Sequence, residues 1–464
     1  MQPPAAPILE QALVKAGVWG DVHPTQQVGD VPAKAAQNPD FNLKTLRAAI
    51  PKKLFEKSLA WSLFYWARDL AILTALYYFR AQFWAWGGLP AKLAWMGTTG
   101  FFGWALFVVG HDCGHGTFSR HKWVNQVMGH IAHAVLLVPF NSWAKSHRPV
   151  PTTLFLCSHC QAAGIAPMLI DWRCGLCGLV RLMTTRLHHL HHNDVDHDHS
   201  WRPNSRAEFD NMALIPGRFF RYSAACLAFV WPIYLCTESR RMGFTGNHFN
   251  PWSPMFEPKE RAGIIASVAC VAAVVGALCY LAAVHGAMLV AQAYVVPYFV
   301  FVIWIDTVTY LQHMDEKCLY FRGKSWSFVS GAMSTYDRTY RHLIDPLNLG
   351  YGRVLDDLHH NISDAHVVHH LFAWSIPHYN LSAATEAIKP VVGEHYRFDP
   401  TPVPVAVARS MRRCCFVEDG VECQKPKPWE AAKVFFEVPI QLRWLLGMET
   451  KTLGEELAGR KKAS

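Results

Sequence analysis

The chain has 464 residues, of which 17% are charged and 13% are aromatic. An ordinary soluble domain carries roughly 25% charged residues, so the composition excludes a disordered chain, a collagen and a coiled coil, and it disfavours a plain soluble globule. The net charge is +9. Because no basic stripe with a known nucleic-acid-binding motif accompanies this charge, we expect it to reflect membrane topology, with no nucleic-acid partner.

Residues 1–58 are predicted to be a cytosolic polar lead-in that ends in a basic stretch. Apolar stretches of about 20 residues are long enough to cross a bilayer as helices. Four such stretches predict four transmembrane helices, at Leu59–Phe79, Leu93–Gly110, Ala262–Val284 and Ala287–Ile305. Two shorter stretches are expected to lie at the membrane interface, at Val124–Phe140 and Tyr222–Cys236.

The loops predict the orientation of these helices. The link between the last two spans, at His285-Gly286, carries no Lys or Arg, whereas both outer flanks are basic. The positive-inside rule therefore places the flanks in the cytosol. The first two spans return the chain to the cytosol near residue 111, so residues 111–221 and 313–464 share that side. We expect an all-α membrane protein with about four transmembrane helices and a cytosolic helical cap.

Most of the 25 histidines fall in these two cytosolic segments. Residues spaced i, i+3 or i+4 share one face of a helix. His111 and His115 have this spacing, and so do His366, His369 and His370. Imidazole is a general ligand for first-row metals, and a structural zinc would need only four ligands. The number of histidines therefore favours a pair of iron ions in the cap.

The motifs that carry these histidines resemble those of a known family. His111-Asp112-Cys113-Gly114-His115 and His366-Val367-Val368-His369-His370 resemble the first and third histidine boxes of the membrane-bound fatty-acid desaturases. The resemblance covers about residues 40–420. Arg322–Ser327 and Asp198–Trp201 are most similar to the microsomal omega-3 (methyl-end) branch.

The resemblance implies a di-iron enzyme that uses O2, and electrons from cytochrome b5, to introduce a cis double bond into an acyl-lipid chain. By position in the motifs, the implied iron ligands are His111, His115, His147, His188, His189, His313, His366, His369 and His370. For His313, a polar residue at the membrane interface is an equal alternative. Other activities also remain open: an omega-6 (Delta12) desaturase, a related di-iron hydroxylase or acetylenase, and, more distantly, a histidine-rich membrane metal transporter.

The second histidine box is interrupted. The family pattern is His-Arg-x-His-His, but here 38 residues separate His147-Arg148 from Leu187-His188-His189. Removing residues 149–186 restores the pattern, so we predict that this segment is an insertion that impairs activity if the protein retains it. Alternative ligands for the box are His191 and His192, which complete a local His-x-x-His-His. The insertion also contains two Cys-x-x-Cys pairs, at Cys157/Cys160 and Cys174/Cys177, with near zinc-ribbon spacing.

The predicted desaturase domain spans residues 59–420, and residues 421–464 form a predicted cytosolic tail. A second, shorter insertion is expected at Arg341–Tyr351. Lys461 and Lys462 stand fourth and third from the end and resemble a dilysine retrieval signal of the endoplasmic reticulum. We therefore expect a multi-pass protein of that membrane, with its active site facing the cytosol.

Overall fold

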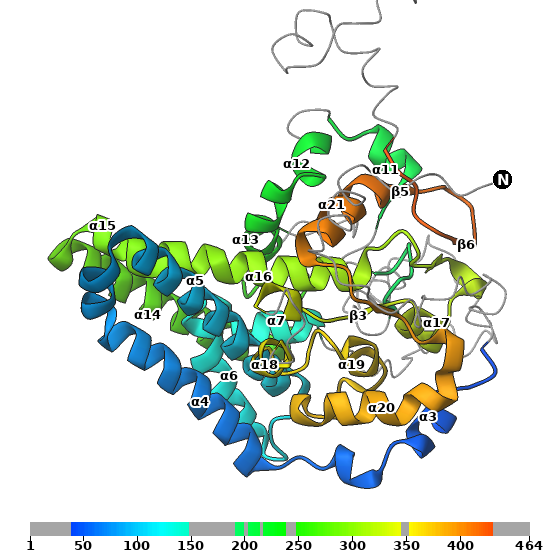
Figure 1. The fold of residues 1–464 in the computed structure, drawn as a ribbon, viewed down its shortest axis with the longest axis horizontal. Coiled ribbons are helices and arrows are strands. Elements are labelled where there is room, and N and C mark those ends of the chain that lie inside the picture. Colours follow the sequence, from blue (N-terminus) through cyan, green and yellow to red (C-terminus); the bar gives the residue numbers. More distant parts are fainter. Residues whose placement is uncertain are drawn as a thin grey trace, which may run out of the picture.

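The computed structural model describes residues 39–147, 191–198, 203–213, 217–237, 247–344 and 352–429, and these are mostly helical. Figure 1 shows an arm of long helices that runs into a cap of shorter helices and paired strands. The arm contains α4 (Leu59–Tyr78), α5 (Arg80–His115), α14 (Arg261–His285), α15 (Ala287–Val290) and α16 (Val296–His313), with a π-helical turn at Ala291–Val295 between the last two.

Local sequence explains how the long helices begin, bend and turn. The hydroxyl of Ser58 accepts a hydrogen bond from the amide of Trp61 and caps the start of α4. Gly88 has φ +57 and Pro90 follows it, so α5 is two helical pieces joined at a kink. Gly286 has φ +90, a backbone conformation that favours glycine, and it makes the turn between α14 and α15.

Three segments of the described chain are long and apolar enough to cross a membrane: Arg80–His115, Pro258–His285 and Ala287–His313. They contain three of the four predicted spans. The fourth predicted span forms α4, which is 20 residues long but is not among these three. The structure therefore supports three candidate membrane helices, and a fourth stays a prediction. The predicted interfacial stretch Val124–Phe140 overlaps α6 (Lys122–Ala134), and Tyr222–Cys236 contains α13 (Val230–Cys236); both helices are too short to cross a bilayer.

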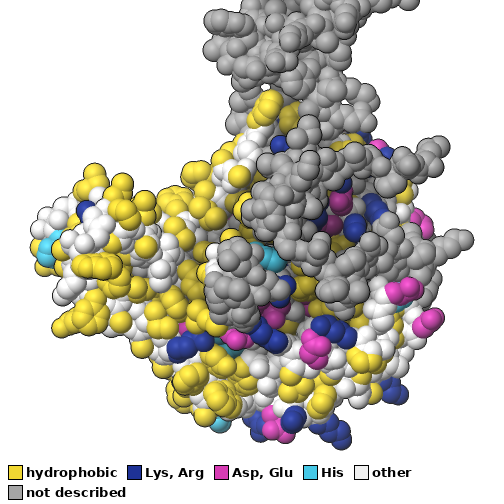
Figure 2. Space-filling model, viewed as in Figure 1, with side chains coloured by type: hydrophobic (Ala, Val, Ile, Leu, Met, Phe, Trp, Pro, Cys, Tyr) yellow, Lys and Arg dark blue, Asp and Glu magenta, His cyan; other side chains and the backbone are white. Residues whose placement is uncertain are grey.

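The arm differs from the cap in what its surface exposes. Hydrophobic side chains cover most of the arm in Figure 2, whereas charged side chains gather around the cap. Large exposed apolar residues on the long helices include Tyr78, Trp86, Tyr280 and Met288. An apolar surface of this kind fits contact with lipid. The part of α5 nearer the cap is instead buried, packed between α4, α6 and α16.

The cap is built from short elements. Its helices are α3 (Leu43–Ala49), α7 (Phe140–His147), α11 (Arg206–Asp210), α12 (Phe219–Arg221), α17 (Phe328–Met333), α18 (Arg353–Leu358), α19 (His366–Phe372), α20 (Leu381–Val392) and α21 (Val403–Arg413), with short turns at Lys52–Phe55, Ala224–Ala228, Pro258–Glu260, Gly323–Ser325, Arg341–Leu343, His378–Asn380 and Gly393–His395. Its strands pair two by two: β1 (Asn204–Ser205) parallel to β5 (Phe416–Val417), β2 (Tyr320–Phe321) antiparallel to β6 (Cys423–Gln424), and β3 (Asp337–Arg338) parallel to β4 (Phe398–Asp399). The largest hydrophobic core joins α5 and α16 to α19 and α20, so the cap and the arm share one interior.

Several sequence predictions fall outside the described residues. These are His188 and His189, the whole of 149–186 with its four cysteines, most of Arg341–Tyr351, and the tail from residue 430 onward with Lys461 and Lys462.

Candidate metal centre

A first group of histidines forms where α5 ends. His111 and His115 lie one helical turn apart, and their Nε2 atoms are 3.1 Å from each other. His369 of α19 joins them, with its ring centroid 4.8 Å from that of His111 and 5.3 Å from that of His115. The ring of His147, at the end of α7, lies 5.2 Å from both. Four imidazoles from three helices therefore meet in one place.

Neighbouring residues fix this group. Gly116 has φ +73 and ends α5 in the left-handed conformation, immediately after His115. The ring of Trp143 stacks on that of His147 at 4.7 Å. The same indole also packs against Gly114, where an added Cβ would come within 2.8 Å of it. Glycine between the two histidines of the motif thus lets α7 approach α5 closely.

A second group forms where α16 ends. The Nε2 atom of His313, the last residue of α16, is 3.1 Å from Nε2 of His366 and 3.2 Å from Nε2 of His370. The three residues are buried. His192 lies beside them, with its ring 4.9 Å from that of His370 and its Nε2 at 2.9 Å from the carbonyl oxygen of Phe328.

Helix α19 connects the two groups. It supplies His369 to the first group and His366 and His370 to the second. The ring of His369 lies 5.9 Å from that of His366 and 5.7 Å from that of His370. Two neighbouring histidine groups that share one helix are an arrangement that could hold a pair of metal ions.

The donor set fits transition-metal ions. Ligand nitrogens at the usual distance of about 2.1 Å from one metal lie about 3.0 Å apart at octahedral angles and about 3.4 Å apart at tetrahedral angles. The Nε2 atoms of His111 and His115 (3.1 Å), and those of His313 with His366 and His370 (3.1 and 3.2 Å), have this separation. Each ring nitrogen of a neutral imidazole is either one donor or one acceptor. Nε2 of His313 faces two other Nε2 atoms, so without a metal it cannot donate a full hydrogen bond to both of them. Sets rich in imidazole suit iron, zinc and copper, whereas magnesium and calcium prefer oxygen.

The sequence predictions can now be compared with this geometry. Seven predicted ligands come together, namely His111, His115, His147, His313, His366, His369 and His370. The two alternative residues of the second box separate: His192 lies against the second group, whereas His191 lies beside Asp194 and His197. His188 and His189 lie outside the described residues, so their part in the second box stays a prediction.

A buried carboxylate ties the first motif to the chain after α19. Oδ2 of Asp112 accepts hydrogen bonds from the backbone N–H of His378 and from its Nδ1, both at 3.0 Å. Asp112 is the second residue of the first histidine motif, and His378 begins the short turn His378–Asn380 that follows α19. The contact therefore keeps α5 and α19 in a fixed relation, although neither residue belongs to the two groups.

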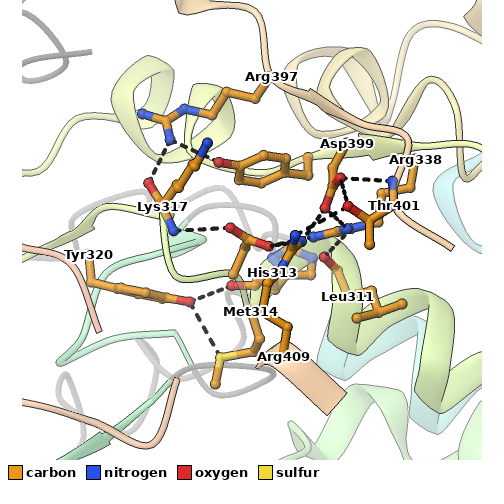
Figure 3. A network of polar contacts seen from close by, with 12 residues as sticks. Leu311, His313, Met314, Lys317, Tyr320, Arg338, Arg397, Asp399, Thr401 and Arg409 are labelled. Carbon is orange, nitrogen blue, oxygen red and sulfur yellow. Dashed lines mark hydrogen bonds and ion pairs between the residues drawn. The ribbon is translucent and has the colours of Figure 1, made fainter. Parts of the chain in front are cut away.

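A second support holds the end of α16 (Figure 3). Arg338 donates from Nε to the carbonyl oxygen of Leu311 at 2.8 Å and from its terminal nitrogens to Asp315, at 2.9 Å, and to Asp399. Arg409 pairs with the same two carboxylates. The hydroxyl of Tyr320 donates to the carbonyl oxygen of His313 at 2.5 Å. These contacts fix the backbone that carries His313.

A third support was missed by the sequence reasoning. Nε2 of His360 lies 2.6 Å from Oδ2 of Asp69, and Arg68 also contacts both side chains. Burial lowers the pKa of His360 to about 4, although Asp69 acts in the opposite direction. His360 is therefore neutral and donates to the carboxylate. The only signal in the sequence was the Arg68-Asp69 pair inside an apolar stretch.

Known proteins with similar sequences identify the family. A family model described as fatty acid desaturase matches residues 157–400. An sn-1 acyl-lipid omega-3 desaturase (ferredoxin) of Synechocystis sp. is 36% identical over 389 residues, which are 83% of this chain and 92% of that protein. The chain belongs to the fatty acid desaturase family. It is an oxidoreductase of the membrane type, as the resemblance of its histidine motifs implied.

Two further relatives are of the same kind. An omega-3 fatty acid desaturase of the endoplasmic reticulum from Vigna radiata is 37% identical over 361 residues, covering 77% of this chain and 80% of that protein. A chloroplastic omega-3 fatty acid desaturase from Brassica napus is 37% identical over 390 residues, covering 82% of each chain. The predicted resemblance to the omega-3 branch is confirmed, and an enzyme of this family replaces the metal-transporter alternative.

Proposed function

We propose that this desaturase introduces an omega-3 cis double bond into acyl lipids at a di-iron centre held by its two histidine groups. The observation that carries the proposal is α19, which supplies His369 to one group and His366 and His370 to the other. His111, His115 and His147 complete the first group, and His313 and His192 the second. His188 and His189 add ligands if the second box takes the family register.

The chemistry explains why the protein needs a metal. The substrate loses two hydrogens from neighbouring methylenes, and with two electrons and two protons one O2 becomes two waters. An alkyl C–H bond offers no group for acid–base or nucleophilic attack, so bound iron supplies the redox step. The chain's own part is to hold the ligands and exclude water. Seven of the eight histidines named for the two groups are buried and His147 is partly exposed, and aromatic residues such as Trp143 and Trp374 lie against the first group.

The omega-3 position rests on the relatives, because histidine groups are common to desaturases with other regiospecificities. Three relatives carry omega-3 activity in their names. An omega-6 desaturase or a di-iron hydroxylase would use the same groups and differ in how the acyl chain is positioned. The products therefore decide between these activities.

The electron donor and the membrane are part of the proposal as well. Cytochrome b5 and the endoplasmic reticulum are the expectations from sequence, and one relative is of that membrane. The cyanobacterial relative instead has ferredoxin in its name, and another relative is chloroplastic. Either electron carrier would approach from the side of the cap, because both histidine groups lie at the cap ends of α5 and α16.

The experiment is expression in a yeast that lacks omega-3 desaturation and is fed omega-6 fatty acids, once with its own cytochrome b5 and once with added ferredoxin and its reductase. We expect new omega-3 acyl chains, lost in His366→Gln and retained in His121→Gln, which changes an exposed histidine that belongs to neither group. Product only with ferredoxin would reject cytochrome b5. Hydroxylated or omega-6 products, or omega-3 product retained in His366→Gln, would overturn the proposal.

A further inference from the structure

A third cluster of metal-binding side chains lies outside the two histidine groups. His191, Asp194 and His197 each offer a ligand atom, and these atoms lie within 4.8 Å of one another. The cluster follows the interrupted second box in sequence. Its neighbour His192 packs against His370, whereas the ring of His191 stacks on Trp326 at 5.0 Å. His191 and His192 are adjacent in sequence, but their side chains therefore lie in different clusters.

The carboxylate at the centre of the cluster is buried and faces imidazoles. Oδ2 of Asp194 lies 2.8 Å from Nδ1 of His197 and 3.6 Å from Nδ1 of His191. Its side chain is only 4% exposed, whereas that of His197 is 58% exposed. In the described parts of the chain, no lysine or arginine pairs with Asp194. A cation at this position would therefore meet a negative charge that no lysine or arginine of the described residues neutralises.

One contact within the cluster is better explained by a metal ion than by a hydrogen bond. The 3.6 Å between Nδ1 of His191 and the carboxylate is too long for a hydrogen bond. That nitrogen is buried, and no described residue forms a hydrogen bond with it. Two ligands of one tetrahedral ion lie roughly 3.3 Å apart. Nδ1 of His191 therefore points into the cluster, and its distance of 3.6 Å from the Asp194 carboxylate is close to the separation of two ligands on one ion.

The backbone around the cluster is held in place. Asn193 has φ +58, a left-handed conformation, and its amide donates to Asp198 at 3.0 Å. The backbone of Asn193 and Val195 exchanges hydrogen bonds with Phe321 of β2, both at 3.0 Å. The other oxygen of Asp194 accepts from the amide of Asp196 at 3.0 Å. The ligand atoms therefore sit on a fixed turn.

We propose that His191, Asp194 and His197 form a separate mononuclear site for a divalent transition-metal ion, with water in the remaining positions. Two imidazoles and one carboxylate are a ligand set used for zinc and for iron(II), and they leave coordination positions open. Calcium and magnesium are disfavoured, since they require mostly oxygen ligands. The partly exposed His197 gives ions access from solvent, which the buried groups of the di-iron centre do not.

The test uses the full chain, purified in detergent with its iron centre loaded, and Co2+ as the probe. Cobalt bound per chain is measured after dialysis, together with its visible absorption spectrum and the iron content. We expect the wild-type chain to bind one Co2+ more than His197→Gln and Asp194→Asn, in the presence of excess magnesium. Iron content should be the same in all three, and His121→Gln, the matched control, should bind Co2+ like the wild type.

Equal Co2+ binding by the wild type and His197→Gln would overturn the site and leave only a histidine–carboxylate hydrogen bond. Cobalt uptake matched by loss of iron would overturn it too, because the ion would then enter the di-iron centre. His197 is exposed, so its variant should keep the unfolding temperature of the wild type. The iron content reports on the proposed function separately, so the failure of one proposal is not mistaken for failure of the other.

Discussion

The support beneath His313 can be tested by removing one buried arginine. Arg338 is 2% exposed at its side chain and pairs with Asp315 and Asp399. Replacing it by methionine in Arg338→Met leaves two buried carboxylates with one arginine between them. Loss of one partner of a buried ion pair costs about 3–5 kcal/mol. Because the entropy of unfolding scales with length, a chain of 464 residues shifts by about 1 °C per kcal/mol, which gives a drop of roughly 3–5 °C in the unfolding temperature.

A matched control separates this cost from a general effect of losing an arginine. Arg413 pairs with Glu316, but its side chain is 52% exposed, and such surface pairs contribute only about 0–1 kcal/mol. The measurement is thermal unfolding in detergent, with the iron content of each variant. We expect Arg338→Met to unfold at lower temperature and hold less iron than Arg413→Met. Equal unfolding temperatures for the two variants would refute the reasoning that the network stabilises the end of α16.

Three further predictions address other parts of the account. Burial alone would raise the pKa of Asp399, but its two arginine partners outweigh burial and hold the pKa below its usual range. The stability that this carboxylate contributes is therefore present above about pH 4 and is lost as the pH falls further. Asp399→Asn should flatten the dependence of the unfolding temperature on pH below about pH 4. An added Cβ at Gly331 would lie 2.4 Å from the carbonyl oxygen of His192, so Gly331→Ala should displace this histidine and lower iron content and desaturation, whereas Gly97→Ala, with open space around it, should not. Deleting 149–186 should raise the yield of desaturated product per chain while the iron content stays at two; an unchanged or lower yield would contradict the prediction that the segment impairs activity.

The sequence predicted the helices of the site but not how they meet. The i, i+4 spacing places His111 and His115 on one face of α5, and the structure has them there. That α19 divides its histidines between two groups depends on how α5 and α16 pack together and where each of them ends, which spacing within one helix does not reveal. The choice between His191 and His192 likewise depends on contacts with residues far away in sequence, Trp326 and His370.

Polar residues in apolar stretches were the weakest part of the prediction. Leu59–Phe79 is predicted to be a membrane span, and Leu59–Tyr78 does form a helix of 20 residues. Its Asp69 is buried against His360, so the helix packs on the cap as well as continuing into the arm. A hydropathy pattern shows only that such a residue is costly in lipid. His360, the partner of Asp69, is almost 300 residues away in sequence and becomes evident only in the folded chain.

The most direct test of the central claim is the iron content of the purified chain and of two histidine variants. If two histidine groups share α19 and hold one ion each, the wild type should contain two irons. His369→Gln, which removes the contribution of α19 to the first group, should contain fewer, and His121→Gln should contain two. An active desaturase without iron, or a His369→Gln variant that keeps both irons, would contradict the account.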